Sequence, residues 1–156
     1  MSSGNDAKEV KEAGRIQLEE ILVRFNELRE YANILASTIN TYLTQQRELQ
    51  LALETLKNLP EDGGEGYIIL DRLSSAMIPA VINKEWSKGI LVHLGLGYYL
   101  KADKAKALEI ISKRSSNIER VLGELQKRYS VVLEELNRLQ QLLSRGYGGS
   151  QSKGGG

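Results

Sequence analysis

Apolar residues recur at alternating intervals of three and four positions along two long stretches of the chain. Only Gln46 interrupts the pattern in the first stretch, and only Ser115 interrupts it in the second. The apolar positions are Leu18, Ile21, Phe25, Leu28, Ala32, Leu35, Ile39, Tyr42, Leu49, Leu53 and Leu56, followed by Leu108, Ile111, Ile118, Leu122, Leu125, Tyr129, Val132, Leu136, Leu139 and Leu143. A 3.5-residue period held over about five heptads keeps one apolar seam turned toward a partner helix. The pattern therefore predicts two coiled-coil helices, in which Gln46 and Ser115 either set the register or are simply tolerated.

The two seams span similar lengths, residues 18–56 and 108–143, which predicts that they pair with each other. Antiparallel pairing within one chain is the simplest solution, although two chains can in principle exchange helices. Pro60 ends the first helix and Asp103 is a candidate N-cap for the second. We therefore expect helices at 8–59 and 103–145 and a flexible, Gly-rich tail at 146–156. Gly14 and Gly146 occupy the next heptad positions beyond the seams, so the seam is expected to loosen there.

Four short β-strands are predicted between the helices, near residues 67–73, 76–82, 89–94 and 97–101. β-branched and aromatic residues dominate these segments, and Ser74-Ser75 and Gly95 and Gly97 mark turns at hairpin spacing. Pro79 fits an edge strand. The fold class is α+β: a single domain, 1–156, in which a long antiparallel coiled-coil hairpin carries two β-hairpins at 66–101. No spare helix remains to cover the strands, so we expect them to close against other subunits.

Composition narrows the possible partners and the compartment. The 156 residues include 21 basic and 20 acidic side chains, a formal charge of +1, so no strong field attracts nucleic acid or acidic lipid. There are no cysteines, and no apolar run approaches the roughly 20 residues of a membrane span. The first residues also lack the apolar core of a secretory signal. We therefore expect a cytoplasmic protein without a membrane or nucleic-acid partner.

The sequence contains only weak signals for a metal, cofactor or catalytic site. His93 is the only histidine and has no cysteine or carboxylate cluster at metal-ligand spacing, so it is interpreted as a strand residue. Gly95-Leu96-Gly97 lacks the third glycine of a dinucleotide fingerprint and favours a hairpin turn. Trp86 is either a subunit anchor or a half-exposed loop aromatic. We expect no enzyme activity, no cofactor and no metal.

The order helix, two hairpins, helix, with Leu94-Gly95-Leu96-Gly97-Tyr98-Tyr99-Leu100 directly before the second helix, resembles the α class of archaeal-type prefoldins. The resemblance spans roughly residues 16–143. In that family the segment before the second helix consists of an apolar strand, a glycine, a small residue, a second glycine and an aromatic pair. Residues 90–99 follow this order here. Leu96 stands at the position of the small residue, and two hairpins rather than one indicate the α class.

The resemblance implies a hexamer of two α and four β subunits, whose strands form an intersubunit β-barrel. It also implies that the coiled-coil tips hold unfolded client proteins, without using ATP, and pass them to a group II chaperonin. For client binding we select the apolar residues that lie off the seam near the chain termini: Ile16, Leu22, Val23, Val131, Leu133, Leu142 and Tyr147. For oligomerisation we select hairpin residues: Tyr67, Ile69, Ile78, Ile90, Val92, Tyr98 and Tyr99.

Two alternatives remain open from the sequence. The first is a coiled-coil arm that binds RNA, because residues 104–145 contain nine basic residues against five glutamates. Residues 8–58, with seven basic and eight acidic residues, weaken that interpretation. The second is a passive coiled-coil scaffold, which would assemble without affecting the aggregation of a denatured protein.

Overall fold

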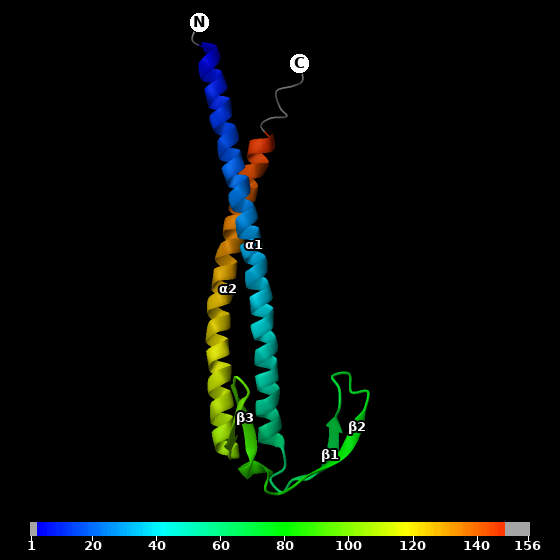
Figure 1. The fold of residues 1–156 in the computed structure, drawn as a ribbon. Helices are drawn as coiled ribbons and strands as arrows, with labels where there is room; N and C mark the ends of the chain where they lie inside the picture. Colours follow the sequence, from blue (N-terminus) through cyan, green and yellow to red (C-terminus); the bar gives the residue numbers. More distant parts are fainter. Residues whose placement is uncertain (1–2, 149–156) are drawn as a thin grey trace. The chain divides into compact units, whose positions relative to one another are not determined.

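The computed structural model describes residues 3–148, with side chains from residue 5 onward, as two long helices separated by two β-hairpins (Figure 1). The elements are α1 (Ser3–Asn58), β1 (Gly64–Ile69), β2 (Met77–Ile82), the short 3-10 helix η1 (Trp86–Lys88), β3 (Ile90–Gly95), β4 (Tyr98–Ala102) and α2 (Lys104–Gly148). Strands β1 and β2 form one antiparallel sheet, and β3 and β4 form another. The predicted element order and the α+β class are confirmed.

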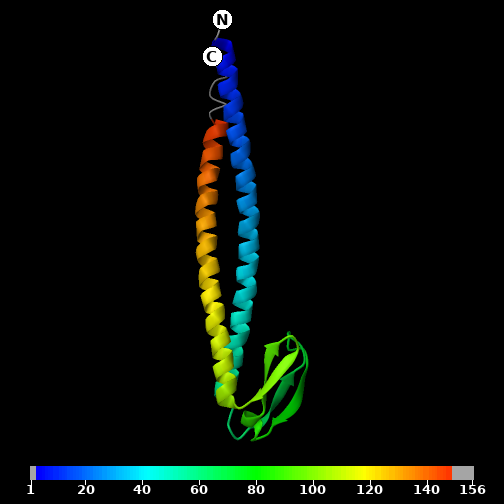
Figure 2. The same cartoon turned by 60° about the vertical axis from the view of Figure 1, so that its left-hand side comes forward.

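The chain forms two compact units. Residues 3–42 and 121–148 make up what we call the terminal unit, and residues 43–120 make up the hairpin unit. Segments of α1 and α2 lie side by side within each unit, as Figures 1 and 2 show. Two stretches far apart in the sequence therefore pair as the seams predict.

The terminal unit is held together by seam residues. Its buried cluster consists of Leu28, Ala32, Leu35, Val132 and Leu139, against which Ile21, Phe25, Leu125, Tyr129 and Leu136 pack. The side chain of Leu18 lies where a Cβ atom on Gly146 would project, and Gly146 is half-buried. Gly146 thus receives Leu18 and does not loosen the seam at that position, whereas α1 residues 5–17 are all exposed. The packing of α1 ends at Leu18, and α2 continues as a helix through Gly148, three residues beyond the expected end of the second helix at residue 145. Residues 149–156 of the expected tail lie outside the described part of the chain.

The hairpin unit has its own cluster, in which β3 and β4 pack against the helices. Leu53, Val92, Ala102, Ala107 and Ile111 are buried there, and Ala107 is completely inaccessible. Asp103 caps α2 as predicted, because its Oδ1 atom accepts a 2.8 Å hydrogen bond from the backbone N–H of Lys106. Across the seam, Gln46 Nε2 donates to Glu119 Oε1 at 2.9 Å, which gives this polar seam position a partner on the other helix.

The first strand of the first hairpin begins and ends earlier than the sequence indicates. β1 covers Gly64–Ile69 instead of 67–73, because Asp71 starts a turn that no strand can continue through. The second strand starts at Met77, one residue later than expected. Pro79 pairs with Tyr67 in this two-stranded sheet, in which every strand is an edge strand, so the placement of the proline is confirmed. No helix within residues 3–148 is long and apolar enough to cross a membrane.

Candidate functional site

The seven residues selected near the chain termini are all exposed in the terminal unit. Their exposed fractions range from 39% for Leu133 to 65% for Val131. Because α1 and α2 satisfy their seams with other side chains, these apolar groups have no partner in the packed cluster. The terminal unit therefore presents apolar side chains to solvent along with charged ones.

These residues do not form one groove. Ile16 and Val23 are seven positions apart on α1, and Val131 and Leu142 are eleven apart on α2, so each pair shares one side of its helix. Leu133 lies on a different side of α2 from Val131, because side chains two positions apart on a helix point away from each other. The apolar groups are thus spread around the helices. Val10, with 72% of its surface exposed, was not selected from the sequence, since it lies in the polar segment that precedes the seam.

The β1–β2 hairpin exposes apolar side chains on both faces. Tyr67 and Ile69 lie on one face together with Pro79, while Ile68 and Ile78 lie opposite each other on the other face. Tyr67 is 71% exposed, Ile69 55% and Ile78 46%. A two-stranded sheet with two uncovered apolar faces is not stable alone in water. Apolar side chains on both faces of this hairpin are exposed in the described part of the chain.

The β3–β4 hairpin differs, because one of its faces is covered by the helices. Val92 is only 4% exposed and Ile90 is half-buried, and both belong to the buried cluster of the hairpin unit. Val92 therefore packs inside its own chain. Of the residues selected for oligomerisation, it is the one that is not available for contact with another subunit. Tyr98 and Tyr99 remain exposed, and the Tyr99 ring lies beside the His93 ring with centroids 4.9 Å apart.

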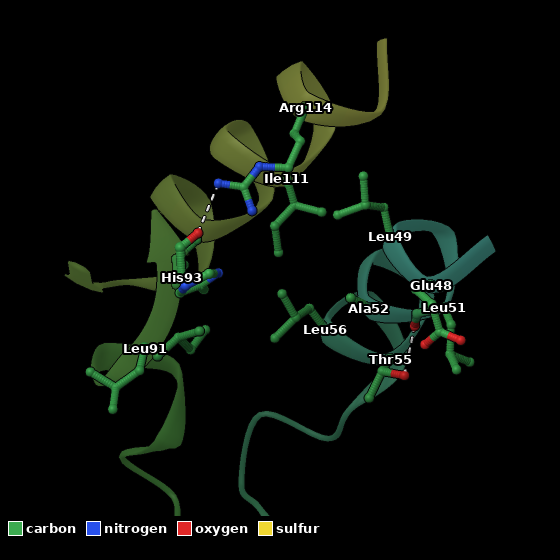
Figure 3. A pocket seen from close by; sticks show the side chains of 12 residues that line it. Glu48, Leu49, Leu51, Ala52, Thr55, Leu56, Leu91, His93, Ile111 and Arg114 are labelled. Atoms are coloured by element: carbon green, nitrogen blue, oxygen red, sulfur yellow. Dashed lines mark hydrogen bonds between the residues drawn. The ribbon is translucent and has the colours of Figure 1, made fainter. Parts of the chain in front are cut away.

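A groove opens between β3 and the last turns of α1 (Figure 3). Its volume is about 450 Å³, and most of its lining is apolar. One end carries Arg114, whose Nη2 atom donates a 2.8 Å hydrogen bond to the backbone carbonyl of His93. This bond ties α2 to β3 and leaves the apolar part of the groove open. The lining includes Leu49, Leu51, Ala52, Leu56, Leu91 and Ile111.

Trp86 connects the two segments that flank the first hairpin. Its Nε1 atom donates a 2.9 Å hydrogen bond to the carbonyl of Pro60, and the Nζ atom of Lys104 lies 5.4 Å from the ring centroid. Trp86 is half-buried by these contacts. These contacts favour the interpretation of Trp86 as a half-exposed loop aromatic, which packs within its own chain at the base of the first hairpin.

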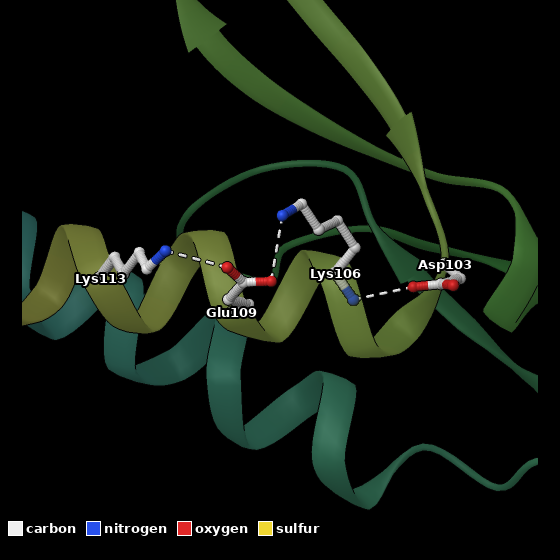
Figure 4. A network of polar contacts seen from close by, with 4 residues as sticks. All are labelled: Asp103, Lys106, Glu109 and Lys113. Carbon is white, nitrogen blue, oxygen red and sulfur yellow. Dashed lines mark hydrogen bonds and ion pairs between the residues drawn. The ribbon is translucent and has the colours of Figure 1, made fainter.

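The charged residues at the start of α2 form a solvated network (Figure 4). Glu109 accepts hydrogen bonds from the Nζ atoms of Lys113 at 2.9 Å and Lys106 at 3.1 Å. These two lysines, Lys113 foremost, hold the pKa of Glu109 below its ordinary value. The group is exposed, which is typical of a helix surface and not of an acid–base pair in a cleft. In the described part of the chain no three histidine, cysteine or carboxylate side chains cluster in a way that could hold a metal ion.

The fold and its surfaces define a class of protein: a coiled-coil hairpin that carries two β-hairpins and exposes apolar groups on both. The family model "Prefoldin subunit" matches residues 28–149, and the chain belongs to the prefoldin family. Membership implies a chaperone subunit.

Individual relatives agree with the α class. The chain is 27% identical over 128 residues to "Prefoldin subunit alpha" of Hyperthermus butylicus, covering 82% of each protein. It is also 27% identical over 141 residues to "Prefoldin subunit alpha" of Saccharolobus solfataricus, covering 85% of this chain and 93% of that protein. The protein of the same name from Sulfurisphaera tokodaii is 26% identical over 147 residues, with 90% of this chain and 93% of the relative covered. These relatives are archaeal.

Proposed function

We propose that this chain is the α-type subunit of a cytoplasmic, hetero-oligomeric chaperone that holds unfolded proteins without ATP. The observation that carries the proposal is that a prefoldin-family chain exposes all seven selected apolar residues in its terminal unit. The partners are β-type prefoldin subunits, in a ratio of two α to four β, and a group II chaperonin receives the client.

The distribution of the apolar residues supports holding over specific recognition. An unfolded polypeptide offers scattered apolar side chains and no fixed shape, so a single deep pocket would be the wrong surface for it. Side chains such as Val23 and Val131, exposed singly around the helices, each contribute a weak contact. Several arms in one oligomer add these contacts through effective concentration. Weak, exposed sites therefore suffice when the subunits assemble.

The β1–β2 hairpin supports assembly. Its exposed residues Tyr67, Ile69 and Ile78 lie on two opposite faces, and edge strands with free backbone groups pair readily with strands of another chain. Strand pairing between subunits would cover these faces and produce the intersubunit β-barrel. Tyr98 and Tyr99 on the second hairpin add exposed aromatic surface of the kind that is enriched at interfaces.

The test combines complex formation with a holding assay. The chain is co-expressed with a candidate β subunit, the mass of the complex is measured, and a chemically unfolded protein is diluted into it with and without ATP. Replacing Ile16, Val23, Val131 and Leu142 by glutamine should leave the mass unchanged and abolish most of the suppression of aggregation. Deleting residues 1–20 together with 140–156 should leave the ratio of the two subunits intact and abolish holding. ATP should make no difference in any sample.

The matched control is Ile34→Gln, which removes an equally exposed apolar side chain farther along α1 (62% exposed) and should keep full holding activity. Retained holding by the fourfold variant would contradict the assignment of the client surface. Assembly without any effect on aggregation, even for the unaltered chain, would identify a passive scaffold. Tight RNA binding that falls steeply with added salt would favour the RNA-binding arm.

A further inference from the structure

Arg114 is a half-buried cation that has no counterion in its own chain. It extends from α2 toward β3, where its Nη2 atom donates the 2.8 Å hydrogen bond to the His93 carbonyl (Figure 3). Within residues 5–148 no carboxylate forms an ion pair with it, although neighbouring lysines of α2 do have such partners. A guanidinium group has five N–H donors, so most of its hydrogen-bonding capacity remains for a ligand.

The space around the guanidinium group is largely apolar. The groove of about 450 Å³ lies on one side, and a second hollow of about 430 Å³ shares Glu48, Leu49, His93 and Arg114 with it. Both hollows belong to the hairpin unit. Small-molecule sites typically enclose about 300–1,000 Å³ and combine apolar walls with a few polar groups. Arg114 is such a polar group, at the point where the two hollows meet.

Glu48 is the second ionised side chain of this lining. It is exposed, and among the described residues it forms no ion pair with Arg114. Figure 3 shows its carboxylate beside α1, well apart from the guanidinium group across the groove. The end of the groove at Arg114 is therefore positively charged, while the space between Arg114 and Glu48 is lined by apolar side chains.

The pairing of one cation with apolar walls defines the chemistry of a ligand. A carboxylate is ionised at pH 7 and matches a guanidinium group with two parallel hydrogen bonds. A small polar anion would leave the apolar walls in water, and an uncharged hydrocarbon would leave the half-buried guanidinium group unpaired. A molecule with an aliphatic chain and a terminal carboxylate satisfies both requirements.

We propose that this groove binds a small aliphatic carboxylate, whose anionic group pairs with Arg114 and whose chain lies along Ala52, Leu56 and Ile111. The inference goes beyond the proposed function and does not depend on the holding of clients. Leu51 and Leu91 at the rim of the groove are 60% and 66% exposed, and the bound chain would remove part of this apolar surface from water.

The first test measures binding of defined probes to the full-length chain. Sodium octanoate and decanoate are titrated by calorimetry below the concentrations at which they form micelles. Decanoate should bind about tenfold more tightly than octanoate, because it buries two more methylene groups. Octanol should bind at least about tenfold more weakly than octanoate, because it brings no charge to the guanidinium group. In NMR spectra, octanoate should shift the backbone amide signals of Leu91, His93 and Arg114.

The second test uses two variants that affect the site in different ways. Arg114→Gln removes the charge and should weaken octanoate binding by about tenfold or more. Ala52→Phe fills the groove without removing a hydrogen bond and should also weaken binding, so a loss of the contact to His93 alone does not account for both results. Arg128→Gln is the matched control, because it removes an exposed arginine of α2 that lies outside the groove. Circular dichroism checks that each variant is folded.

Several results would overturn the proposal. Equal affinities for octanol and octanoate would do so, as would unchanged octanoate binding by Arg114→Gln and Ala52→Phe. Signal shifts confined to exposed apolar residues of the terminal unit, such as Val131, would show nonspecific adsorption of the probe. Loss of octanoate binding in the complex with a β subunit would show that the partner covers the groove. A complex that binds octanoate but fails to hold clients would refute the proposed function and leave this site standing.

Discussion

At the residue scale, the Asp71 carboxylate organises the turn of the first hairpin. It accepts hydrogen bonds from the Ser75 hydroxyl and the Leu73 N–H at 2.8 Å, from the Ser75 N–H at 3.2 Å, and from the Ala76 N–H at 3.3 Å. Ser74 adopts a φ of +57° inside this loop. A short polar side chain that bonds backbone groups ahead of it competes with strand pairing. The turn therefore begins at Asp71 and sets the end of β1.

These hydrogen bonds make the loop sensitive to acid. The Ser75 side chain, followed by its backbone N–H, lowers the pKa of Asp71 below the ordinary value of about 3.9. A depressed pKa means that the carboxylate form stabilises the folded loop at pH values above about 4, and this stabilisation is lost as the pH falls through the folded pKa. An NMR titration should show the Ser75 and Ala76 amide signals moving together with a midpoint below about 3.9. Asp71→Asn should remove that transition, and a midpoint above about 3.9 would contradict the assignment.

At the element scale, each helix is divided into a buried stripe and a solvated surface. Every seam position predicted from the 3.5-residue period, including Gln46 and Ser115, is buried or half-buried. Neighbouring residues outside the stripe differ sharply: Leu35 is 4% exposed and the adjacent Ile34 is 62% exposed. The stability of the terminal unit therefore depends on position relative to the seam and not on apolar content alone.

This difference predicts unequal effects of two adjacent substitutions. Leu35→Ala removes buried side-chain volume from the cluster with Val132 and Leu139 and should lower the free energy of unfolding by about 2–5 kcal/mol. Ile34→Ala removes mainly solvated surface and should change it by less than about 0.5 kcal/mol in either direction. Urea titrations followed by circular dichroism measure both. Equal losses for the two variants would show that α1 and α2 do not pair along this seam.

At the scale of the whole molecule, the two units expose different kinds of apolar surface. The terminal unit presents single side chains spread around helices, such as Val23 and Val131. The hairpin unit presents faces and edges of two-stranded sheets together with the groove. Scattered groups suit weak, repeated contacts with unfolded chains, whereas sheet faces and edges suit fixed contacts between folded subunits.

Assembly should therefore cover both faces of the β1–β2 hairpin. In hydroxyl-radical footprinting of the complex with a β subunit, Tyr67 on one face and Ile78 on the other should both be protected, while Val23 stays reactive. Tyr67→Ser and Ile78→Ser should each reduce the yield of the complex, and Val23→Ser should not. Protection of only one hairpin face would mean that the other contacts solvent or clients in the complex.

The periodicity of the sequence determined the two helices and their pairing, and the residue type at position 103 determined the cap of the second helix, because these features depend on side chains close in the sequence or repeated along it. The two hairpins were predictable for the same reason, from Ser74-Ser75 and from the glycines around Leu96. Only the tertiary structure decided that Val92 is buried against Leu53 and Ile111, since an apolar run on a strand does not tell which face meets the helices. It also decided that Gly146 receives Leu18, and that Leu96 adopts a positive φ of +50° while it is almost fully exposed. These features depend on where distant segments meet, and the local pattern of a sequence does not record that.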